Sequence, residues 1–204
     1  MEITWLGHAC FALESGGYRV VVDPYTVETY PPMHTAADAV YCSHGHADHN
    51  YVQAVELRQG KESPFTVETV STFHDEKGGA LRGSNTMHIF RAEGLTVVHC
   101  GELGHYPTEE QLAAISGADA LLIPVGGYYT IDAAMARRVA DAAKPRTVVP
   151  MHYRHDPYGL RPIGTVEEFL KLYPAGQVHR LDGNRFSLSA DAPEGVVVPR
   201  YIEP

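Results

Sequence analysis

The sequence predicts an α/β domain in which two mixed sheets pack together and helices lie on the outside. Strand-like patterns dominate the first half of the chain, whereas strands and helices alternate in the second half. The chain has 204 residues, of which 44% are hydrophobic, and this length supports one large domain with a substantial core. No tandem repeat is evident, so we expect residues 1–204 to form a single domain.

In the first half, short hydrophobic or alternating runs bounded by Gly, Pro and polar residues predict β-strands. The predicted strands cover residues 2–6, 10–14, 18–22, 39–42, 65–73, 86–91 and 95–100. The last two strands should form a hairpin across residues 92–94. Residues 25–38 and 76–85 predict loops, the second of them over a site, and residues 50–59 predict a helix.

The second half carries clear helix signals. An acidic first turn after Thr108 predicts a helix that ends at Gly117, and Asp132 is the expected N-cap of an alanine-rich helix that ends near Pro145. The continuous hydrophobic run at 120–125 predicts a strand that is buried on both faces. The remaining predictions are a strand at residues 147–151, a helix at 166–173 and a hairpin across 182–184, with the tail from residue 193 unassigned.

Composition narrows the class of protein. Sixteen Lys and Arg residues against 25 Asp and Glu residues give a formal net charge of -9, which argues against nucleic acid as a partner. No stretch of 18 consecutive hydrophobic residues is present, and the N-terminal residues have no basic segment before a hydrophobic run. We therefore expect no membrane association and a cytoplasmic location. The three cysteines, without CxxC spacing, are expected to be small core residues in a reducing compartment.

One stretch, AVYCSHGHADHN at residues 39–50, concentrates potential metal ligands. Residues 39–42 predict a short buried strand. If the strand conformation continues through His44 and His46, its period of two would aim both imidazoles at one point. Asp48 and His49 follow at the expected start of a helix and could face a second point nearby. Imidazole and carboxylate ligands together suit zinc, manganese or iron.

Further candidate ligands follow other predicted strands. His74, Glu102 and His152 each lie just past a strand end, as His44 does, so parallel strands would gather them at one edge of the sheets. Asp23 also follows a strand and precedes a proline. It is either a turn former or a group that orients a metal-bound histidine, and the local sequence does not decide between these roles.

These motifs resemble the metallo-β-lactamase superfamily. The resemblance is carried, in order, by Asp23, by HGHADH at residues 44–49, by His74, by Gly101-Glu102 and by PMHY at residues 150–153. The segments WLGHACF, TFHDEKGGALRGSN and LLIPVGGYYTID are similar to a small single-domain branch of metal-dependent hydrolases that is related to L-ascorbate-6-phosphate lactonase. The resemblance implies a four-layer αβ/βα sandwich with a dinuclear metal site along one edge of both sheets.

The resemblance also implies a ligand set for two divalent metal ions, with Zn²⁺ expected first and Mn²⁺ or Fe²⁺ as alternatives. The first ion would be held by His44, His46 and His74, and the second by Asp48, His49 and His152. The position of Glu102 is normally an aspartate that bridges both ions. Glutamate keeps the charge but adds a methylene group, so the sequence leaves open whether the second site is fully occupied.

Several other residues match positions near the site in relatives. His8 and His105 could each contact the substrate or a metal ligand, or could be a surface histidine. His105 is also a candidate catalytic residue. Arg82, Asn85 and Arg154 lie beside the motifs and are candidates for binding an anionic substrate group, although for Arg154 a solvated surface arginine is the simpler interpretation. Cys100 is an alternative soft ligand but more simply a core residue. The remaining histidines are expected to be structural, namely His34, His88, His99, His155 and His179.

The expected activity is metal-dependent hydrolysis of a small, anionic ester, lactone or phosphoester. A water activated by the ions would attack the substrate, and Asp48 would orient that water and pass its proton to the leaving group. The alternatives are a metal-binding sensor or scaffold without turnover, which the departure at Glu102 favours, and an RNA nuclease. An RNA nuclease fits less well because this acidic chain has no room for an additional RNA-gripping domain.

Overall fold

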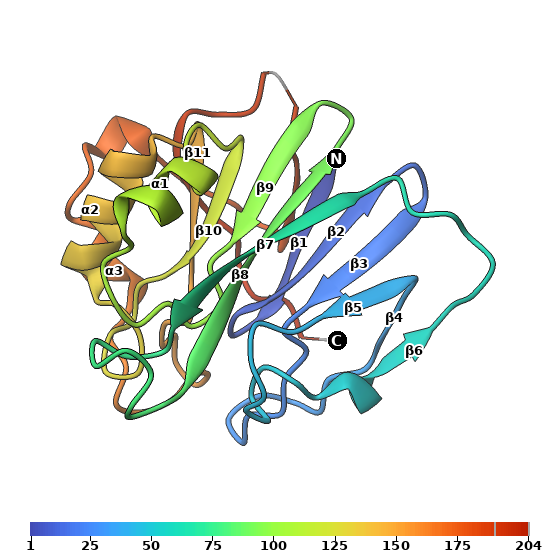
Figure 1. Cartoon of the computed structure of the whole chain (residues 1–204), viewed down its shortest axis with the longest axis horizontal. Coiled ribbons are helices and arrows are strands. Elements are labelled where there is room, and N and C mark those ends of the chain that lie inside the picture. The colour runs from blue at the N-terminus through green and yellow to red at the C-terminus, as the bar shows by residue number, and fades with distance from the viewer. Residues whose placement is uncertain (190, 204) are drawn as a thin grey trace.

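A computed structural model describes residues 1–189 and 191–203 of the chain, and it contains two main sheets that face each other (Figure 1). The five-stranded sheet has the order β13 (Arg185–Ser187), β1 (Glu2–Gly7), β2 (Cys10–Ser15), β3 (Tyr18–Val22) and β5 (Ala39–Tyr41). The seven-stranded sheet has the order β12 (Val178–Arg180), β14 (Gly195–Val198), β11 (Thr147–Met151), β10 (Ala120–Pro124), β9 (Leu95–His99), β8 (Ser84–Ala92) and β7 (Thr66–Phe73).

Both sheets are mixed, as predicted. In the five-stranded sheet only the pairing of β3 with β5 is parallel. In the seven-stranded sheet β7, β8 and β9 form an antiparallel meander, and the strands from β9 through β10, β11 and β14 to β12 are parallel. The predicted hairpin across residues 92–94 is the turn between β8 and β9.

The main core lies between the two sheets. Strand β2 shows how the sequence builds it, because successive side chains of a strand point to opposite faces. Phe11 and Leu13 belong to the large core cluster shared with the seven-stranded sheet, whereas Cys10 and Ala12 belong to a smaller cluster on the outer face. Strand β10 is buried along its whole length, as its continuous hydrophobic run predicts.

Three helices cover the outer face of the seven-stranded sheet (Figure 1). They are α1 (Glu109–Ile115), α2 (Ala133–Ala143) and α3 (Val166–Leu170). Helix α2 buries Ala136, Val139 and Ala140. Asp132 is its N-cap, as predicted, and accepts a 2.8 Å hydrogen bond from the backbone N–H of Met135.

The outer face of the five-stranded sheet is covered differently, and here one prediction is wrong. The helix expected at residues 50–59 does not form. Instead a short 3₁₀ turn, η1 (Val52–Ala54), leads into β6 (Val55–Leu57), which pairs in parallel with β4 (Thr35–Ala37) inside the predicted loop. Val55 and Ala37 are buried in the outer cluster, so tertiary pairing overrides the local helix preference.

The hairpin expected across residues 182–184 is also wrong. Strand β12 pairs in parallel with β14, whereas β13 pairs antiparallel with β1 in the other sheet. Residues 182–184 therefore carry the chain from one sheet to the other. Turn residues predict that the chain changes direction, but they do not predict which strand the next segment will pair with. Here the partner is β1, which lies far away in the sequence. The unassigned tail supplies β14.

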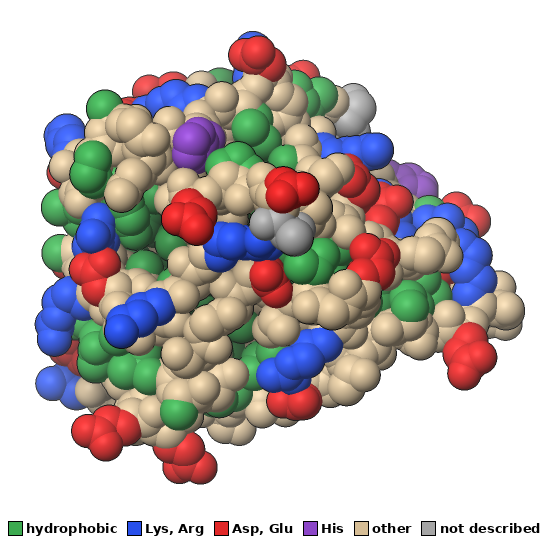
Figure 2. Space-filling model, turned by 90° about the horizontal axis from the view of Figure 1, so that it is seen from above, with side chains coloured by type: hydrophobic (Ala, Val, Ile, Leu, Met, Phe, Trp, Pro, Cys, Tyr) green, Lys and Arg blue, Asp and Glu red, His purple; other side chains and the backbone are tan. Residues whose placement is uncertain are grey.

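Acidic and basic side chains are interspersed over the face of the molecule seen from above in Figure 2. None of the helices in the described residues combines the length and the hydropathy that a membrane span requires.

Candidate metal centre

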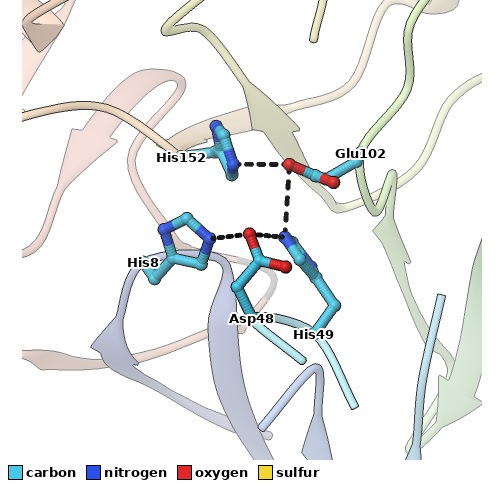
Figure 3. A group of neighbouring side chains, drawn as sticks. All are labelled: His8, Asp48, His49, Glu102 and His152. Carbon is cyan, nitrogen blue, oxygen red and sulfur yellow. Dashed lines mark ion pairs between the residues drawn. The ribbon is translucent and has the colours of Figure 1, made fainter. Parts of the chain in front are cut away.

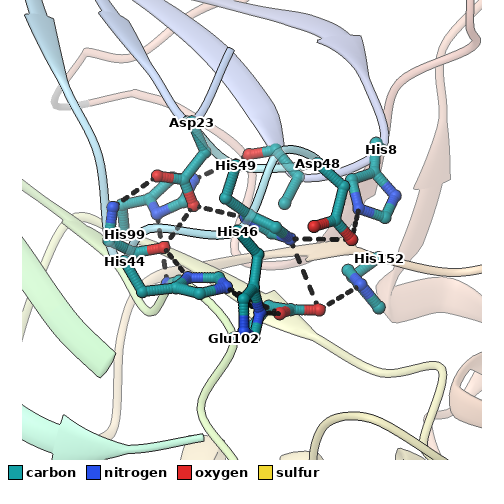
Figure 4. A network of polar contacts seen from close by, with 12 residues as sticks. His8, Asp23, His44, His46, Asp48, His49, His99, Glu102 and His152 are labelled. Atoms are coloured by element: carbon teal, nitrogen blue, oxygen red, sulfur yellow. Dashed lines mark hydrogen bonds and ion pairs between the residues drawn. The ribbon is translucent and has the colours of Figure 1, made fainter. Parts of the chain in front are cut away.

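The candidate ligands meet where the ends of strands from both sheets lie together, as the strand-end pattern predicts (Figure 4). Asp23 follows β3, His44 to His49 follow β5, and His8 lies in the turn from β1 to β2. From the other sheet, His74 follows β7, Glu102 follows β9 and His152 follows β11. Segments far apart in the sequence thus build one site.

The segment that carries His44 and His46 is a turn and not the extension of a strand. Strand β5 ends at Tyr41, and the backbone N–H of His49 donates a 2.9 Å hydrogen bond to the carbonyl of His46. The strand conformation, on which the expected alternation of His44 and His46 depended, therefore does not continue through this motif. The two imidazoles still converge, with His44 Nε2 3.0 Å from His46 Nδ1, because the turn folds one ring beside the other.

A first group of possible ligands consists of His44, His46, His74 and Glu102, whose ligand atoms all lie within 4.8 Å of one another. His44 Nε2 is 3.0 Å and His46 Nδ1 is 4.0 Å from Glu102 Oε2, and His74 Nε2 pairs with the same oxygen. The side chain of His46 is 51% exposed, whereas its three neighbours are nearly buried. This group is thus open to solvent on one side.

A second group consists of His8, Asp48, His49, Glu102 and His152 (Figure 3). Its ligand atoms also lie within 4.8 Å of one another, and all of its members except Asp48 are buried. His49 Nε2 is 3.3 Å and His152 Nε2 is 2.6 Å from Glu102 Oε1. Burial and the neighbouring His152 lower the pKa of His8 to about 4, which keeps its ring in the neutral form that can bind a metal.

Glu102 lies between the two groups, with Oε2 facing the first and Oε1 facing the second. Burial alone would raise its pKa, but the electrostatic interactions with His49 and His152 hold the pKa well below the usual range of a glutamate. Asn85 fixes the main chain here, because its Oδ1 accepts a 2.8 Å hydrogen bond from the N–H of Glu102. Gly101 has a φ of 58°, and a Cβ there would lie only 2.5 Å from Ser43 Cβ.

Asp23 supports the second group from behind. Its carboxylate accepts hydrogen bonds from the N–H of Ser43 at 2.6 Å, from Ser43 Oγ at 2.7 Å and from His49 Nδ1 at 2.8 Å. Burial by itself would raise the pKa of Asp23, but the bond and charge of His49 outweigh it and lower the pKa to about 2. Of the two roles left open by the sequence, the structure therefore supports the orienting one.

The donor set fits a metal ion. Nε2 of His8, His49 and His152 and Nδ1 of His74 are buried and have no hydrogen-bond partner among the described residues. The 2.6 Å approach of His152 to Glu102 lacks hydrogen-bond geometry. Buried polar atoms are normally paired. Imidazole nitrogens and carboxylate oxygens that converge in this way form a donor set suited to zinc, manganese or iron.

A pocket of about 430 Å³ opens onto both groups. His46, Asp48, His74 and Glu102 line its floor, and Arg82, Tyr129 and Leu160 line the remainder. This volume suits a small molecule. A larger hollow of about 630 Å³ beside α2 contains none of the candidate ligands.

A family model described as the Beta-lactamase superfamily domain matches residues 2–152. The structure of a Thermotoga maritima protein, described as a Zn-dependent hydrolase of the metallo-β-lactamase superfamily, covers 97% of this chain and 97% of its own at 34% identity, with a TM-score of 0.74. This chain belongs to the metallo-β-lactamase superfamily. The predicted class, a metal-dependent hydrolase of this superfamily, is confirmed.

Two further proteins are similar to this chain. A metal-dependent hydrolase of Archaeoglobus fulgidus is 29% identical over 77% of this chain and 85% of its own length. The structure of a metallo hydrolase from Ignicoccus hospitalis covers 100% of this chain and 95% of its own with a TM-score of 0.61, and at 20% identity it supports the fold alone.

His105, which the sequence suggested as a catalytic residue, does not lie among the candidate metal ligands. Its Nε2 accepts a 3.2 Å hydrogen bond from the N–H of Phe73 and its Nδ1 donates a 2.9 Å bond to the carbonyl of Tyr106. With both nitrogens engaged by the backbone, and with His105 in neither group of described ligands, the structure does not support the expected catalytic role. His105 instead links β7 to the loop that precedes α1.

Three further candidates neither line the pocket nor belong to a ligand group among the described residues. Asn85 is buried and bonded entirely to protein groups, since its Nδ2 donates to Thr72 Oγ1 and to the Cys100 carbonyl, so it supports Glu102 and does not contact substrate. Arg154 pairs with Asp156 at 2.6 Å and is not among the residues that line the pocket in the described chain. Cys100 lies in the core and in neither ligand group.

Sequence reasoning missed Tyr129 and Leu160 in the pocket wall. Both lie in loops after strands, Tyr129 after β10 and Leu160 after β11, but neither carries a metal-binding side chain. The guanidinium of Arg82 lies 5.7 Å from the ring centroid of Tyr129 and donates to the carbonyl of Tyr128 at 3.2 Å. One sequence signal could have pointed to Tyr129 as a pocket residue: it belongs to a pair of tyrosines that follows two glycines at the end of a strand.

Proposed function

We propose that this hydrolase uses two divalent metal ions, Zn²⁺ first among them, to hydrolyse a small anionic ester, lactone or phosphoester. The observation that carries the proposal is Glu102, whose two oxygens each face one group of histidines. A single carboxylate shared in this way suits a dinuclear centre. The added methylene group of glutamate is therefore compatible with a bridge.

The proposed ligands divide between the two ions. The first ion would be bound by His44, His46, His74 and Glu102 Oε2, and the second by Asp48, His49, His152 and Glu102 Oε1. The unpaired, buried Nε2 atoms of His49 and His152 support the second set, because ligand nitrogens must be deprotonated and free of other partners. Imidazole and carboxylate donors favour Zn²⁺, with Mn²⁺ or Fe²⁺ as alternatives.

Divalent ions held by these residues would supply a water of lowered pKa and would polarise the bond under attack. Asp48 is the proposed acid–base residue, since its side chain lines the pocket and is 27% exposed. Burial would raise its pKa, but the neighbouring rings of His8 and His49 outweigh burial and hold the pKa below the usual range, so the carboxylate is ionised near neutral pH. It can orient the water and carry its proton to the leaving group.

Arg82 supports an anionic substrate. It lies in the pocket wall with its backbone N–H bonded to Asp75 Oδ2 at 2.7 Å. Asp75 also accepts the N–H groups of Lys77, Gly79 and Leu81, so one carboxylate holds the loop that carries Arg82. Guanidinium groups bind carboxylate and phosphate oxygens well. Bound divalent ions would further offset the formal charge of -9 at this place.

Metal analysis and a substrate panel test the proposal. Protein purified without chelator should contain metal, and it should hydrolyse at least one member of a panel of esters, lactones and phosphodiesters that includes bis(p-nitrophenyl) phosphate. A chelator should abolish that activity, and added Zn²⁺ or Mn²⁺ should restore it. Activity that survives exhaustive metal removal would refute the mechanism.

The same experiment separates the alternatives. A sensor or scaffold would bind two ions tightly and turn over none of the three substrate classes. Its main support from the sequence was the departure at Glu102, and the position of both Glu102 oxygens weakens that support. An RNA nuclease would cleave an oligoribonucleotide faster than a small phosphodiester, which a pocket of about 430 Å³ does not favour.

A further inference from the structure

His8, in the turn between β1 and β2, has a buried ring that packing does not explain. Its side chain is fully buried, and neither ring nitrogen has a hydrogen-bond partner in the described part of the chain. The ring centroid lies 4.4 Å from that of His152 and 5.0 Å from that of His49. A buried histidine normally satisfies at least one nitrogen. The unpaired nitrogens therefore require another explanation.

The main chain of His8 is held in an uncommon conformation. Its φ of 52° lies in the left-handed region, which few residues other than glycine adopt. Trp5 Nε1 donates to the His8 carbonyl at 3.1 Å, the N–H of His152 donates to the same carbonyl at 3.2 Å, and the N–H of His8 donates to Tyr30 Oη at 3.1 Å. Neighbouring residues thus fix this conformation, which aims the ring into the second group.

The position of the ring nitrogen fits a ligand better than a hydrogen-bonding partner. Figure 3 shows the His8 ring directed at Asp48, with Nε2 3.7 Å from Asp48 Oδ2. That distance is too long for a hydrogen bond. Two atoms that each lie roughly 2.0–2.2 Å from one ion are separated by at most about 4.4 Å, so 3.7 Å suits two ligands of the same ion.

We propose that His8 is a direct ligand of the second ion, beyond the set carried over from the superfamily motifs. The inference rests on the proposed two-metal function. The second ion would then have five protein ligands, of which only Asp48 is partly exposed. His8 is not among the described residues that line the pocket, which argues against a contact with substrate. The enclosed second ion should be bound more tightly than the first, where His46 is half-exposed.

Zinc titration of His8→Gly tests this role. Glycine adopts a φ of 52° without strain, so the variant removes the ring and leaves the backbone conformation accessible. Metal-free wild type and variant would be titrated with Zn²⁺ by calorimetry. We expect the tighter of two binding events to weaken by at least about tenfold, as changes around a metal site commonly do, and the weaker event to stay unchanged. Free imidazole should restore part of the lost affinity in His8→Gly and have no such effect on wild type.

Two controls keep the outcomes separate. His8→Asn, which also tolerates the left-handed region, replaces His8→Gly if circular dichroism shows that the latter does not fold. His88→Gln removes a buried histidine outside both groups and should bind Zn²⁺ like wild type. Wild-type affinity for both ions in a folded His8 variant would overturn the inference, as would a loss in His8→Gly that imidazole does not rescue. A wild type that binds only one ion would instead overturn the two-metal function.

Discussion

His49 Nδ1 donates a 2.8 Å hydrogen bond to Asp23 Oδ2, and this bond leaves His49 Nε2 free to face Glu102. The carboxylate thus selects the tautomer and the ring orientation of a proposed ligand without touching the metal.

Asp23→Asn should therefore weaken binding of the second ion by about 10- to 100-fold. The amide group would present N–H groups to Ser43 or His49, which both donate to Asp23. Calorimetric titration with Zn²⁺ measures the change. Asp132→Asn is the matched control, because Asn is an equally good N-cap and Asp132 lies outside both ligand groups. Equal affinities in the two variants would contradict the orienting role.

Removal of single histidines should distinguish ligands from structural residues. His46→Ala and His152→Ala should each lower the metal content of purified protein, because each removes one donor from one group. His88→Ala and His179→Ala should keep wild-type metal content, since neither residue belongs to a group in the described chain. Elemental analysis after dialysis provides the measurement. The same metal content in all four variants would refute the ligand assignment.

Glu102→Asp should reduce the protein from two tightly bound ions to one. The N–H of Glu102 is anchored to Asn85, and both carboxylate oxygens already contact their groups, so a side chain shorter by one methylene cannot reach both without a backbone shift. A Zn²⁺ titration counts the tight sites. Two unchanged sites in Glu102→Asp would mean that the main chain can move to compensate.

Arg82→Gln should raise KM for anionic substrates by about tenfold while kcat changes little, because the loss of one charged hydrogen bond costs about 1.5 kcal/mol. For a neutral ester, KM should stay close to the wild-type value. Arg154→Gln is the control, since Arg154 pairs with Asp156 and not with the pocket. Equal effects of Arg82→Gln on neutral and anionic substrates would exclude recognition of charge.

His88 should make the protein less stable in acid. Burial, and secondly the charge of His99, lower the pKa of His88 to about 4, whereas an unfolded histidine titrates near 6.5. Between these values the unfolded chain binds a proton that the native state does not, so the free energy of unfolding falls as the pH drops from about 6.5 to 4, by up to about 3 kcal/mol.

His88→Phe should remove this part of the acid sensitivity, because the ring packs beside Phe90 and Tyr41 and phenylalanine keeps that packing without titrating. Denaturant unfolding at pH 7 and pH 4.5 measures the difference for both proteins. Other acid effects, including metal release, are common to both and cancel in the comparison. An equal loss of stability in both proteins would refute the role of His88.

Much of the site could be predicted because its ligands follow local rules. The run from His44 to His49 is contiguous, and His74, Glu102 and His152 each follow a strand that its hydrophobic pattern identifies. The fold class was predictable for the same reason, since strand and helix periodicity is a local signal.

The parts that failed depend on contacts between distant segments. Residues 50–59 look helical, but Val55 is drawn into β6 by pairing with β4. Leu160 reaches the pocket only because the loop after β11 folds over it. The burial of His8 against His152 depends on how the two sheets dock. No local pattern encodes these arrangements.

The spread of the ligands along the chain has a kinetic consequence. His8 and His152 come from different sheets and from opposite parts of the sequence, so their rings meet only after both sheets have formed and docked. The complete metal site therefore does not exist until the last step of folding, when the two sheets dock. Bound metal should raise the activation free energy of unfolding by the full binding free energy and leave the refolding rate of the chain nearly unchanged. The metal would thus stabilise the native state after folding and would not guide the folding itself.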